Sequence, residues 1–141
     1  MKQVNLILVF NAELSQVLMC ERVKDPYQGK LNFVGGKKKT DETDLEAAYR
    51  ELREETGITA QDILLYPLYT TTYYQDGIEL AVYMGRLIHD VRLVEELNPL
   101  IWVECSSDFT ESRFAGNGNI QHMIDQAMDH KVLLYSESTE P

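Results

Sequence analysis

Three glutamates, Glu51, Glu54 and Glu55, lie close together in the stretch "YRELREETGI", which ends at Ile58. In a helix, the spacing i, i+3 and i+4 places their carboxylates on one face. Like charges at this spacing repel one another by roughly a few tenths of a kcal/mol per pair, and the C-terminal end of a helix dipole disfavours anions further. An arrangement that is unfavourable within the chain indicates that a cation from outside binds there.

A hard divalent cation would compensate this negative charge. Mg²⁺, or Mn²⁺ in its place, binds oxygen ligands, needs few protein carboxylates and keeps positions for water and phosphate oxygens. The opposing interpretation is a solvated face, because Glu46, Arg50 and Glu54 form an i, i+4 ladder of alternating sign. That ladder leaves Glu51 and Glu55 without an i, i+4 partner of opposite sign, so both interpretations are open.

Length and charge limit the classes of partner. The 141 residues suffice for one domain with a core, assigned to residues 1–135, followed by the polar tail "SESTEP" at 136–141. The formal net charge of −10 at pH 7 disfavours a nucleic acid polymer, which proteins usually bind with a basic face. A single nucleotide is not disfavoured, because a bound divalent cation reverses the local sign of the charge.

Cysteine usage and hydropathy bear on the compartment. Cys20 and Cys105 lie in apolar, strand-like surroundings and are interpreted as buried thiols rather than as a disulfide. The apolar run Val4–Phe10 is too short to span a bilayer, and no small-residue cleavage site follows it. These features predict a cytoplasmic protein without a membrane partner.

The elements that must position the glutamates alternate between strands and helices. Apolar runs bounded by turn residues predict strands at 3–10, 16–23, 31–34, on both sides of the hairpin turn Asp76–Gly77, and at 100–105. The order of strands, helix, strands and helix predicts an α+β fold, with a mixed sheet and helices packed on its faces.

Two amphipathic helices complete this pattern. The first opens at a capping box formed by Thr43 and Glu46 and ends at Gly57. The second is predicted to begin at a cap supplied by Asn119. Their apolar faces recur at helical spacing and comprise Leu45, Ala48 and Leu52 in the first helix, and Ile120, Met123, Ile124 and Ala127 in the second.

The stretch from Gly36 to Ile58 also fits a longer signature, G-x5-E-x7-R-E-U-x-E-E-x-G-U, in which U is aliphatic. The matching residues are Gly36, Glu42, Arg50, Glu51, Leu52, Glu54, Glu55, Gly57 and Ile58. On these residues the chain resembles the Nudix hydrolases, with no departure at a required position. The resemblance implies an α/β/α sandwich that cleaves nucleoside diphosphates linked to another group X, by attack of water on phosphorus with the help of Mg²⁺.

The resemblance also assigns roles to residues of the motif. Glu51, Glu54 and Glu55 would share metal ligation with the carbonyl oxygen of Gly36, and Glu51 best matches the residue often proposed as general base. Arg50 would orient the carboxylates through charge-assisted hydrogen bonds. Structural roles are implied for the remaining motif residues, which are Gly35, Glu42 and Gly57.

Many members add one more acid from a loop after the central hairpin. Here Glu95 and Glu96 precede Trp102, and MutT-type members carry an acid six residues before a comparable tryptophan, which selects Glu96 as a metal ligand. A solvated charged turn explains these two glutamates equally well.

The substrate is less constrained than the chemistry. The MutT branch hydrolyses ordinary or oxidised nucleoside triphosphates to the monophosphate and pyrophosphate. Phe33 and Asn117 stand where that branch has its base-binding aromatic and asparagine, but they could equally be a core residue and a turn residue. Arg22 is a candidate contact to phosphate or base, although a surface arginine is the simpler interpretation. Val34 replaces the proline of many members. Three lysines at 37–39 lie close to the expected phosphates, although a run of lysines on a loop is usually solvated.

Three alternatives stay open. The enzyme could cleave a nucleotide sugar or a dinucleotide instead of a triphosphate, or the domain could be a non-catalytic nucleotide sensor. The complete set of three glutamates weighs against the sensor, because a binding module does not need a carboxylate that activates water. A homodimer is neither indicated nor excluded by the sequence.

Overall fold

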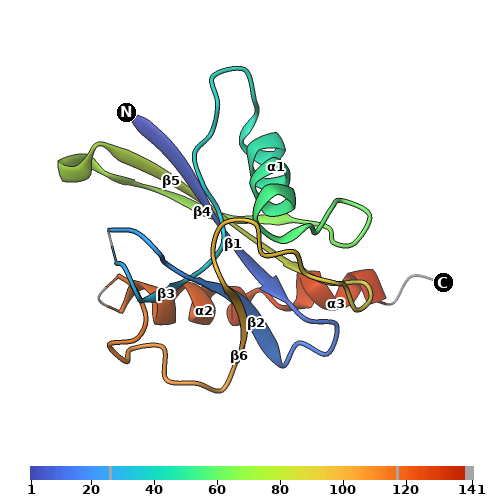
Figure 1. Ribbon diagram of the computed structural model, residues 1–141. Coiled ribbons are helices and arrows are strands. Elements are labelled where there is room, and N and C mark those ends of the chain that lie inside the picture. The colour runs from blue at the N-terminus through green and yellow to red at the C-terminus, as the bar shows by residue number, and fades with distance from the viewer. Residues whose placement is uncertain (26, 117, 139–141) are drawn as a thin grey trace.

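The structure is a computed structural model that describes residues 1–25, 27–116 and 118–138. Its elements are β1 (Lys2–Phe10), β2 (Gln16–Glu21), β3 (Leu31–Asn32), α1 (Asp44–Thr56), β4 (Tyr66–Tyr73), the 3₁₀ turn η1 (Tyr74–Asp76), β5 (Ile78–Arg86), β6 (Leu100–Glu104), α2 (Asn119–Asp129) and α3 (Val132–Ser138). Figure 1 shows their arrangement. The expected strands and both expected helices are present.

The strands form one mixed sheet in the order β3-β2-β1-β5-β4, with β6 paired to β2. The β1 and β5 strands are parallel, whereas the β1–β2, β2–β3, β2–β6 and β4–β5 pairs are antiparallel. The β4–β5 hairpin turns at η1, and Gly77 follows with a φ of 64°, which confirms the Asp76–Gly77 turn.

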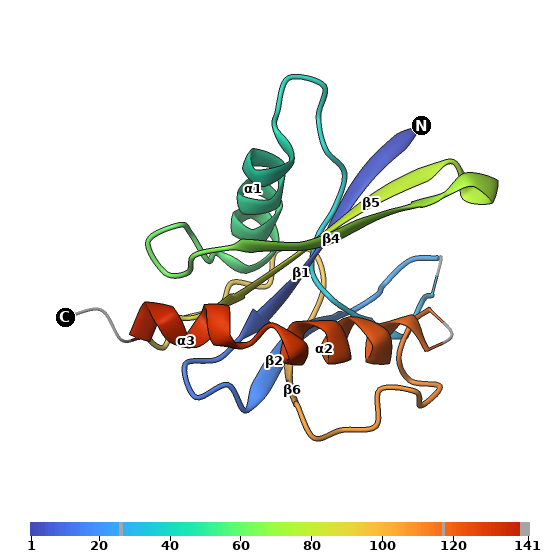
Figure 2. The ribbon, with the colours of Figure 1, turned by 180° about the vertical axis from the view of Figure 1, so that it is seen from behind.

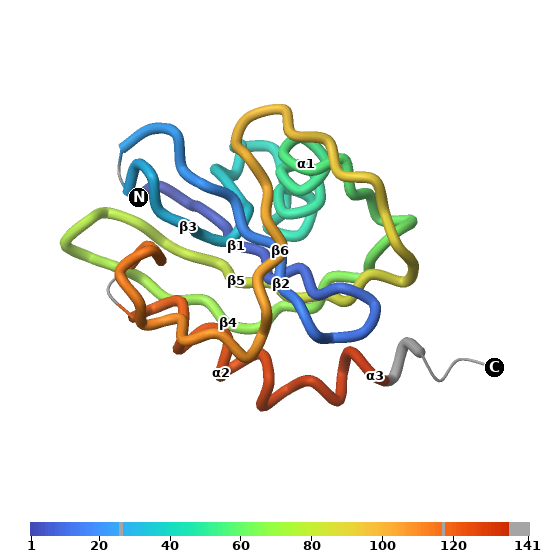
Figure 3. Tube along the Cα trace, turned by 60° about the horizontal axis from the view of Figure 1, so that its bottom comes forward, coloured from blue at the N-terminus to red at the C-terminus, as the bar shows by residue number. Residues whose placement is uncertain are grey.

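Helices cover both faces of this sheet. Along β1, Ile7 and Val9 pack into a core cluster with Leu52 of α1, while Leu8 and Phe10 pack into a second cluster with residues of α2 and α3. Successive residues of a strand point to opposite faces, so one apolar strand supplies both cores. Figure 3 shows the three layers, and Figure 2 shows α2 and α3 following one another on the side opposite α1. The mixed α/β/α sandwich is therefore confirmed.

The sheet opens between β1 and β2. These strands pair only near the Phe10–Val17 partners, and the N-terminal half of β1 pairs instead with the loop after β3. In that pairing Val34 lies opposite Ile7 and Lys37 lies opposite Val4. The opening seats Gly35–Gly36 beside β1, next to α1.

The first helix begins and ends as predicted, but the predicted burial of Leu45 is wrong. The Thr43 side chain accepts a hydrogen bond from the backbone nitrogen of Glu46, and the Glu46 carboxylate accepts one from the backbone nitrogen of Thr43, which completes the capping box. Leu45, however, is 42% exposed. Ala47 is buried in its place, because α1 turns this side rather than the Leu45 side toward the sheet.

The C-terminal part departs from expectation in two ways. The apolar face of α2 is buried as predicted, but Gly118 rather than Asn119 is the N-cap, and no side chain caps the helix. A third helix, α3, was not expected, and it extends through Ser138 into the segment assigned to the polar tail. Leu134 of α3 is buried in the core. This packing explains why a helix forms in a segment whose sequence ends in polar residues.

Two further expectations concern thiols and membranes. Cys20 is buried, Cys105 is half-buried, and both are free thiols. In the described ranges, none of the helices has the length and apolar character needed to cross a membrane.

Candidate active site

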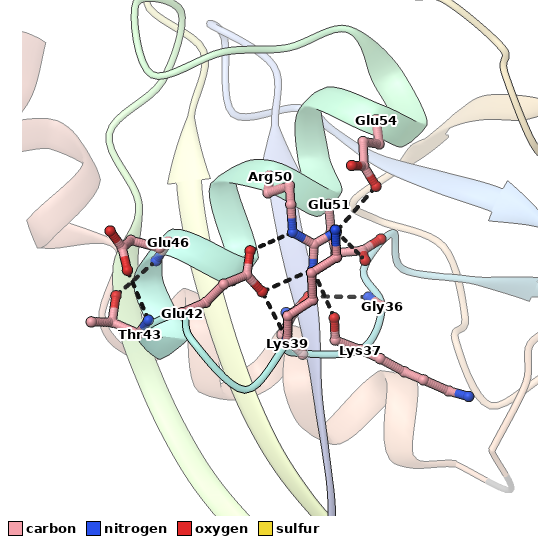
Figure 4. Close-up of polar contacts among 10 residues, drawn as sticks. Gly36, Lys37, Lys39, Glu42, Thr43, Glu46, Arg50, Glu51 and Glu54 are labelled. Atoms are coloured by element: carbon pink, nitrogen blue, oxygen red, sulfur yellow. Dashed lines mark hydrogen bonds and ion pairs between the residues drawn. The ribbon is translucent and has the colours of Figure 1, made fainter.

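Arg50 lies at the centre of the acidic face of α1. Its Nη1 donates to Oε1 of Glu51 at 2.9 Å and to Oε1 of Glu54 at 3.1 Å. Its Nη2 donates to the carbonyl oxygen of Lys37 at 2.8 Å. Figure 4 shows how these contacts join the helix to the loop that precedes it. Arg50 thus balances the charge of two of the three glutamates and fixes the position of one oxygen of each.

Glu42 completes this network from the loop before α1. It accepts hydrogen bonds from both Nε and Nη2 of Arg50 and from the backbone nitrogen of Lys39. These bonds, that from Arg50 foremost, lower the pKa of the Glu42 carboxyl to about 2. The same pairing raises the pKa of Arg50 further above its ordinary value. A bidentate pair of this kind fixes the guanidinium in one orientation.

The alternating ladder accounts for only part of the acidic face. Arg50 does pair with Glu54, but the Glu46 carboxylate is occupied at the helix N-terminus by the capping box. Glu51 obtains its partner from the adjacent residue Arg50 rather than from a residue one turn away. Glu55 accepts its hydrogen bond from the backbone nitrogen of Gly35 instead.

Glu55 is buried to 7% exposure and faces Gly35. Its Oε1 accepts a hydrogen bond of 3.4 Å from the backbone nitrogen of Gly35, and its Oε2 is buried without a hydrogen-bond partner. Burial raises the pKa of the Glu55 carboxyl to about 7, with smaller contributions from the charges of Glu51 and Glu54. An orphaned carboxylate oxygen at this depth is costly unless a cation or a proton satisfies it.

Gly35 and Gly36 bring the backbone against these carboxylates. A Cβ on Gly36 would lie 2.3 Å from Oε2 of Glu51, and a Cβ on Gly35 would lie 2.1 Å from the carbonyl oxygen of Asn5. At Gly35 the obstacle is backbone, so only glycine fits, whereas at Gly36 a side chain would have to push the Glu51 carboxylate aside. At the far end of α1, Gly57 adopts a φ of 81° and closes the helix.

Asn5 holds the glycine loop in place. Its backbone nitrogen donates to the Gly36 carbonyl oxygen at 2.8 Å, and its Oδ1 accepts from the Gly36 nitrogen at 3.1 Å. Asn5 is 4% exposed, and its role was missed at the level of sequence. The signal available was a single polar residue inside the apolar run of the first strand.

The donor set fits a hard divalent cation. The unpartnered Glu55 oxygen, the Glu51 carboxylate against Gly36, and the second lone pair of the Gly36 carbonyl are all oxygen ligands. Within the described part of the chain, no three His, Cys, Asp or Glu side chains are gathered closely enough to form a metal site by themselves. Glu51 and Glu54 are instead paired with Arg50, so their carboxylates lie on the same helix face as Glu55 but bind a guanidinium.

A cavity of about 450 Å³ adjoins the glycine loop. Glu55, Gly35 and Gly36 lie on its wall together with Arg22 and Phe33. The positive charge of Arg22 acts against the rise in the pKa of Glu55 that burial causes. Phe33 borders the cavity but is 2% exposed and belongs to the core, so it offers little surface to a ligand.

Other polar residues on the cavity wall were not predicted. Asn32 is half-buried there, and its Oδ1 accepts from the backbone nitrogen of Phe33 at 2.8 Å. Asn119, expected as a helix cap, also borders the cavity. Asn117, the expected base contact, lies outside the described residues.

The loop between β5 and β6 carries the two remaining candidate acids. Glu95 accepts a hydrogen bond of 2.7 Å from the backbone nitrogen of Leu100, which closes the loop on itself. Glu96 is exposed. The loop reaches the end of α1, where the backbone nitrogen of Val94 donates to the Thr56 carbonyl at 2.9 Å. Both side chains are exposed, but one carboxylate oxygen of Glu95 is held by the loop.

Comparison with known proteins agrees with this geometry. The model of the NUDIX domain matches residues 1–114. The chain belongs to the Nudix hydrolase family. The signature from Gly36 to Ile58 contains the ion pairs that Arg50 forms with Glu42, Glu51 and Glu54. As a Nudix hydrolase, the protein is an enzyme that acts on pyrophosphate bonds. None of the curated proteins searched matches the chain.

Solved Nudix structures share the fold at low sequence identity. The NUDIX domain of Shewanella oneidensis NrtR complexed with ADP ribose superposes with a TM-score of 0.74 at 17% identity, covering 91% of this chain and 86% of that one. A MutT structure, described with the MutT proteins of Aliivibrio salmonicida and Vibrio cholerae, superposes with a TM-score of 0.67 at 19% identity. The match covers 92% of this chain and 98% of that one. A MutT/nudix family protein from Enterococcus faecalis gives 0.62 at 18%, and the match spans 73% of this chain but only 43% of that one.

Proposed function

We propose that this Nudix hydrolase is a Mg²⁺-dependent pyrophosphohydrolase that converts a nucleoside triphosphate to the monophosphate and pyrophosphate. The observation that carries the proposal is Glu55, a buried carboxylate with one unpartnered oxygen on the wall of a nucleotide-sized cavity. A triphosphate brings both the metal that would satisfy this oxygen and the anhydride that the family cleaves. Mn²⁺ is expected to substitute for Mg²⁺.

The chain would contribute ligands, orientation and a proton acceptor. Glu51, Glu54, Glu55 and the Gly36 carbonyl would hold the metal, with Glu96 as a further ligand from its loop. When bound, the metal would neutralise phosphate oxygens and lower the pKa of water. Water would attack a phosphorus of the anhydride, the bridging P–O bond would break, and Glu51 would accept the proton from water.

Arg50 and Glu42 would act on geometry. Arg50 would hold Oε1 of Glu51 and Oε1 of Glu54 in place and leave the other oxygen of each carboxylate for the metal, while its bidentate bond with Glu42 keeps the guanidinium fixed. Arg22 on the cavity wall would contact a phosphate. At the base end of the ligand, Phe33 would back the cavity wall from the core, since it is 2% exposed, and Asn117, from outside the described residues, would contact the base.

The test is a panel of nucleoside triphosphates, sugar nucleotides and dinucleotides incubated with Mg²⁺, with and without EDTA. Release of pyrophosphate from a triphosphate, abolished by EDTA, is the expected result. The panel includes oxidised and ordinary triphosphates of each base, so the preferred base is obtained in the same experiment. A Glu51→Gln variant should lose most of this activity, because the proton acceptor is gone.

A nucleotide sugar is the second candidate, supported by the fold neighbour that binds ADP ribose. Cleavage of sugar nucleotides or dinucleotides alone would refute the triphosphate assignment while leaving the carboxylate roles intact. Binding of nucleotides without turnover of any compound would instead refute catalysis and favour a sensor.

A further inference from the structure

The three consecutive lysines at 37–39 do not share one environment. Lys37 lies opposite Val4 in the antiparallel pairing with β1, and the backbone nitrogen of Lys38 donates to the Gln3 carbonyl one position along. Adjacent residues of an extended segment point to opposite faces. Lys38 accordingly turns toward α1, where its Nζ lies 3.1 Å from Oδ1 of Asp44. Lys37 turns to the other face, onto the cavity wall.

Lys2 joins Lys37 on that face. Lys2 and Val4 are two residues apart on β1, so their side chains point the same way. Because Val4 is paired with Lys37, Lys2 is the diagonal neighbour of Lys37, a relation that brings long side chains within reach of each other across a sheet. Both lysines border the cavity. Figure 4 shows the Lys37 side chain extending away from the Arg50 cluster.

Neither ammonium group is used by the protein itself. Counting only residues that the structure describes, no carboxylate lies within ion-pair distance of Lys2 or Lys37, whereas Lys38 and Arg50 are both paired. Because like charges repel, two cations on the same face of neighbouring segments are unfavourable unless an anion lies between them. The cavity wall also carries Glu55, Asp76 and Arg22, so the two lysines act together with Arg22 to make part of it attractive to an anion.

We propose that Lys2 and Lys37 together bind the phosphate of the substrate that is furthest from the nucleoside, so that the enzyme prefers triphosphates to nucleoside diphosphates. Lys37 directly follows Gly36, so its side chain starts beside the carboxylates that would hold the scissile anhydride. The terminal phosphate of a triphosphate adds negative charge on the far side of that anhydride. The ammonium groups of the two lysines would donate hydrogen bonds to its oxygens. This inference rests on the proposed triphosphate activity and adds the residues that select for phosphate number.

The first experiment measures binding without turnover. Inorganic tripolyphosphate and pyrophosphate are titrated in excess Mg²⁺ into the wild type and into Lys2→Gln, Lys37→Gln and Lys39→Gln. Lys39 is the matched control, since it belongs to the same lysine run but does not border the cavity. We expect Kd for tripolyphosphate to rise about five- to tenfold in each of the first two variants, with pyrophosphate affinity changing less than about twofold. Lys39→Gln should resemble the wild type.

The second experiment compares kcat/KM for one nucleoside triphosphate and its diphosphate. Lys2→Gln and Lys37→Gln should raise KM for the triphosphate about five- to tenfold and leave kcat within about twofold. Lys2→Arg and Lys37→Arg should restore most of the preference, since the charge returns, and high salt should shrink the difference between variants. Tripolyphosphate affinities equal to that of Lys39→Gln in both glutamine variants would overturn the lysine inference even if triphosphates are hydrolysed. Weakened tripolyphosphate binding in an enzyme that cleaves no triphosphate would refute the proposed function and leave the lysine site standing.

Discussion

Glu55→Gln should stabilise the metal-free protein while it removes most activity. Burial raises the pKa of the Glu55 carboxyl from 4.5 to about 7, so ionising it in the folded state is disfavoured. A difference of roughly 2.5 pKa units corresponds to about 3 kcal/mol, at about 1.4 kcal/mol per unit. The glutamine amide would leave one buried polar group unpaired, at a cost of about 1–2 kcal/mol. The net gain in unfolding free energy above pH 7 is therefore about 1–2 kcal/mol.

The sign of this effect depends on pH. Because the folded pKa of Glu55 lies above the unfolded value, folded protein binds the proton more tightly, and stability falls as pH rises from about 4.5 to about 7. Below that window Glu55 is protonated in both states, and the glutamine variant should be equal to the wild type or slightly less stable. Above it, the variant should melt about 3–6 °C higher in EDTA.

The assay is thermal unfolding at pH 5 and pH 8, in EDTA and in Mg²⁺, beside the turnover measurement. Mg²⁺ should raise the Tm of the wild type by binding the folded state and should raise that of Glu55→Gln much less. Glu54→Gln is the matched control, since Glu54 is half-exposed and pairs with Arg50, so its Tm difference should be small and independent of pH. A Glu55→Gln protein that is destabilised equally at both pH values and keeps its activity would refute the cation-site interpretation.

Three other changes test separate parts of the site. Gly36→Ala should reduce kcat more than tenfold with a Tm change below about 4 °C, because the new methyl group displaces the flexible Glu51 carboxylate rather than the core; kinetics and melting of one preparation check this. Glu42→Gln should remove the part of the acid destabilisation that occurs between about pH 4 and pH 2, since the Arg50 bond lowers the folded pKa of Glu42 and its stabilisation is lost as pH falls through about 2; an unchanged acid-unfolding profile would contradict it. Glu96→Gln should raise the Mg²⁺ concentration needed for half-maximal activity at least threefold and leave Tm in EDTA unchanged; equal Mg²⁺ dependence would remove Glu96 from the site.

Local rules predicted most of the fold. The capping box at Thr43, the helix end at Gly57 and the turn at Asp76–Gly77 depend on contacts between residues close in sequence, so sequence suffices to place them. Leu45 was misplaced because helical periodicity defines a stripe but not which edge of that stripe meets the sheet. The α3 helix was missed because Leu134 is buried by distant residues, and its own sequence is short.

The motif by itself determined which residues form the acidic face and that the face is electrostatically unfavourable. Tertiary structure decided how the charge is divided, since Arg50 reaches Glu51, Glu54 and the distant Glu42, whereas Glu55 is buried against the glycine loop. It also decided that Lys37 faces the cavity with Lys2, because their meeting depends on the register between β1 and a loop some 35 residues later in the sequence. Spacing along a helix can be counted from sequence, but burial and cross-strand register exist only once the sheet has formed.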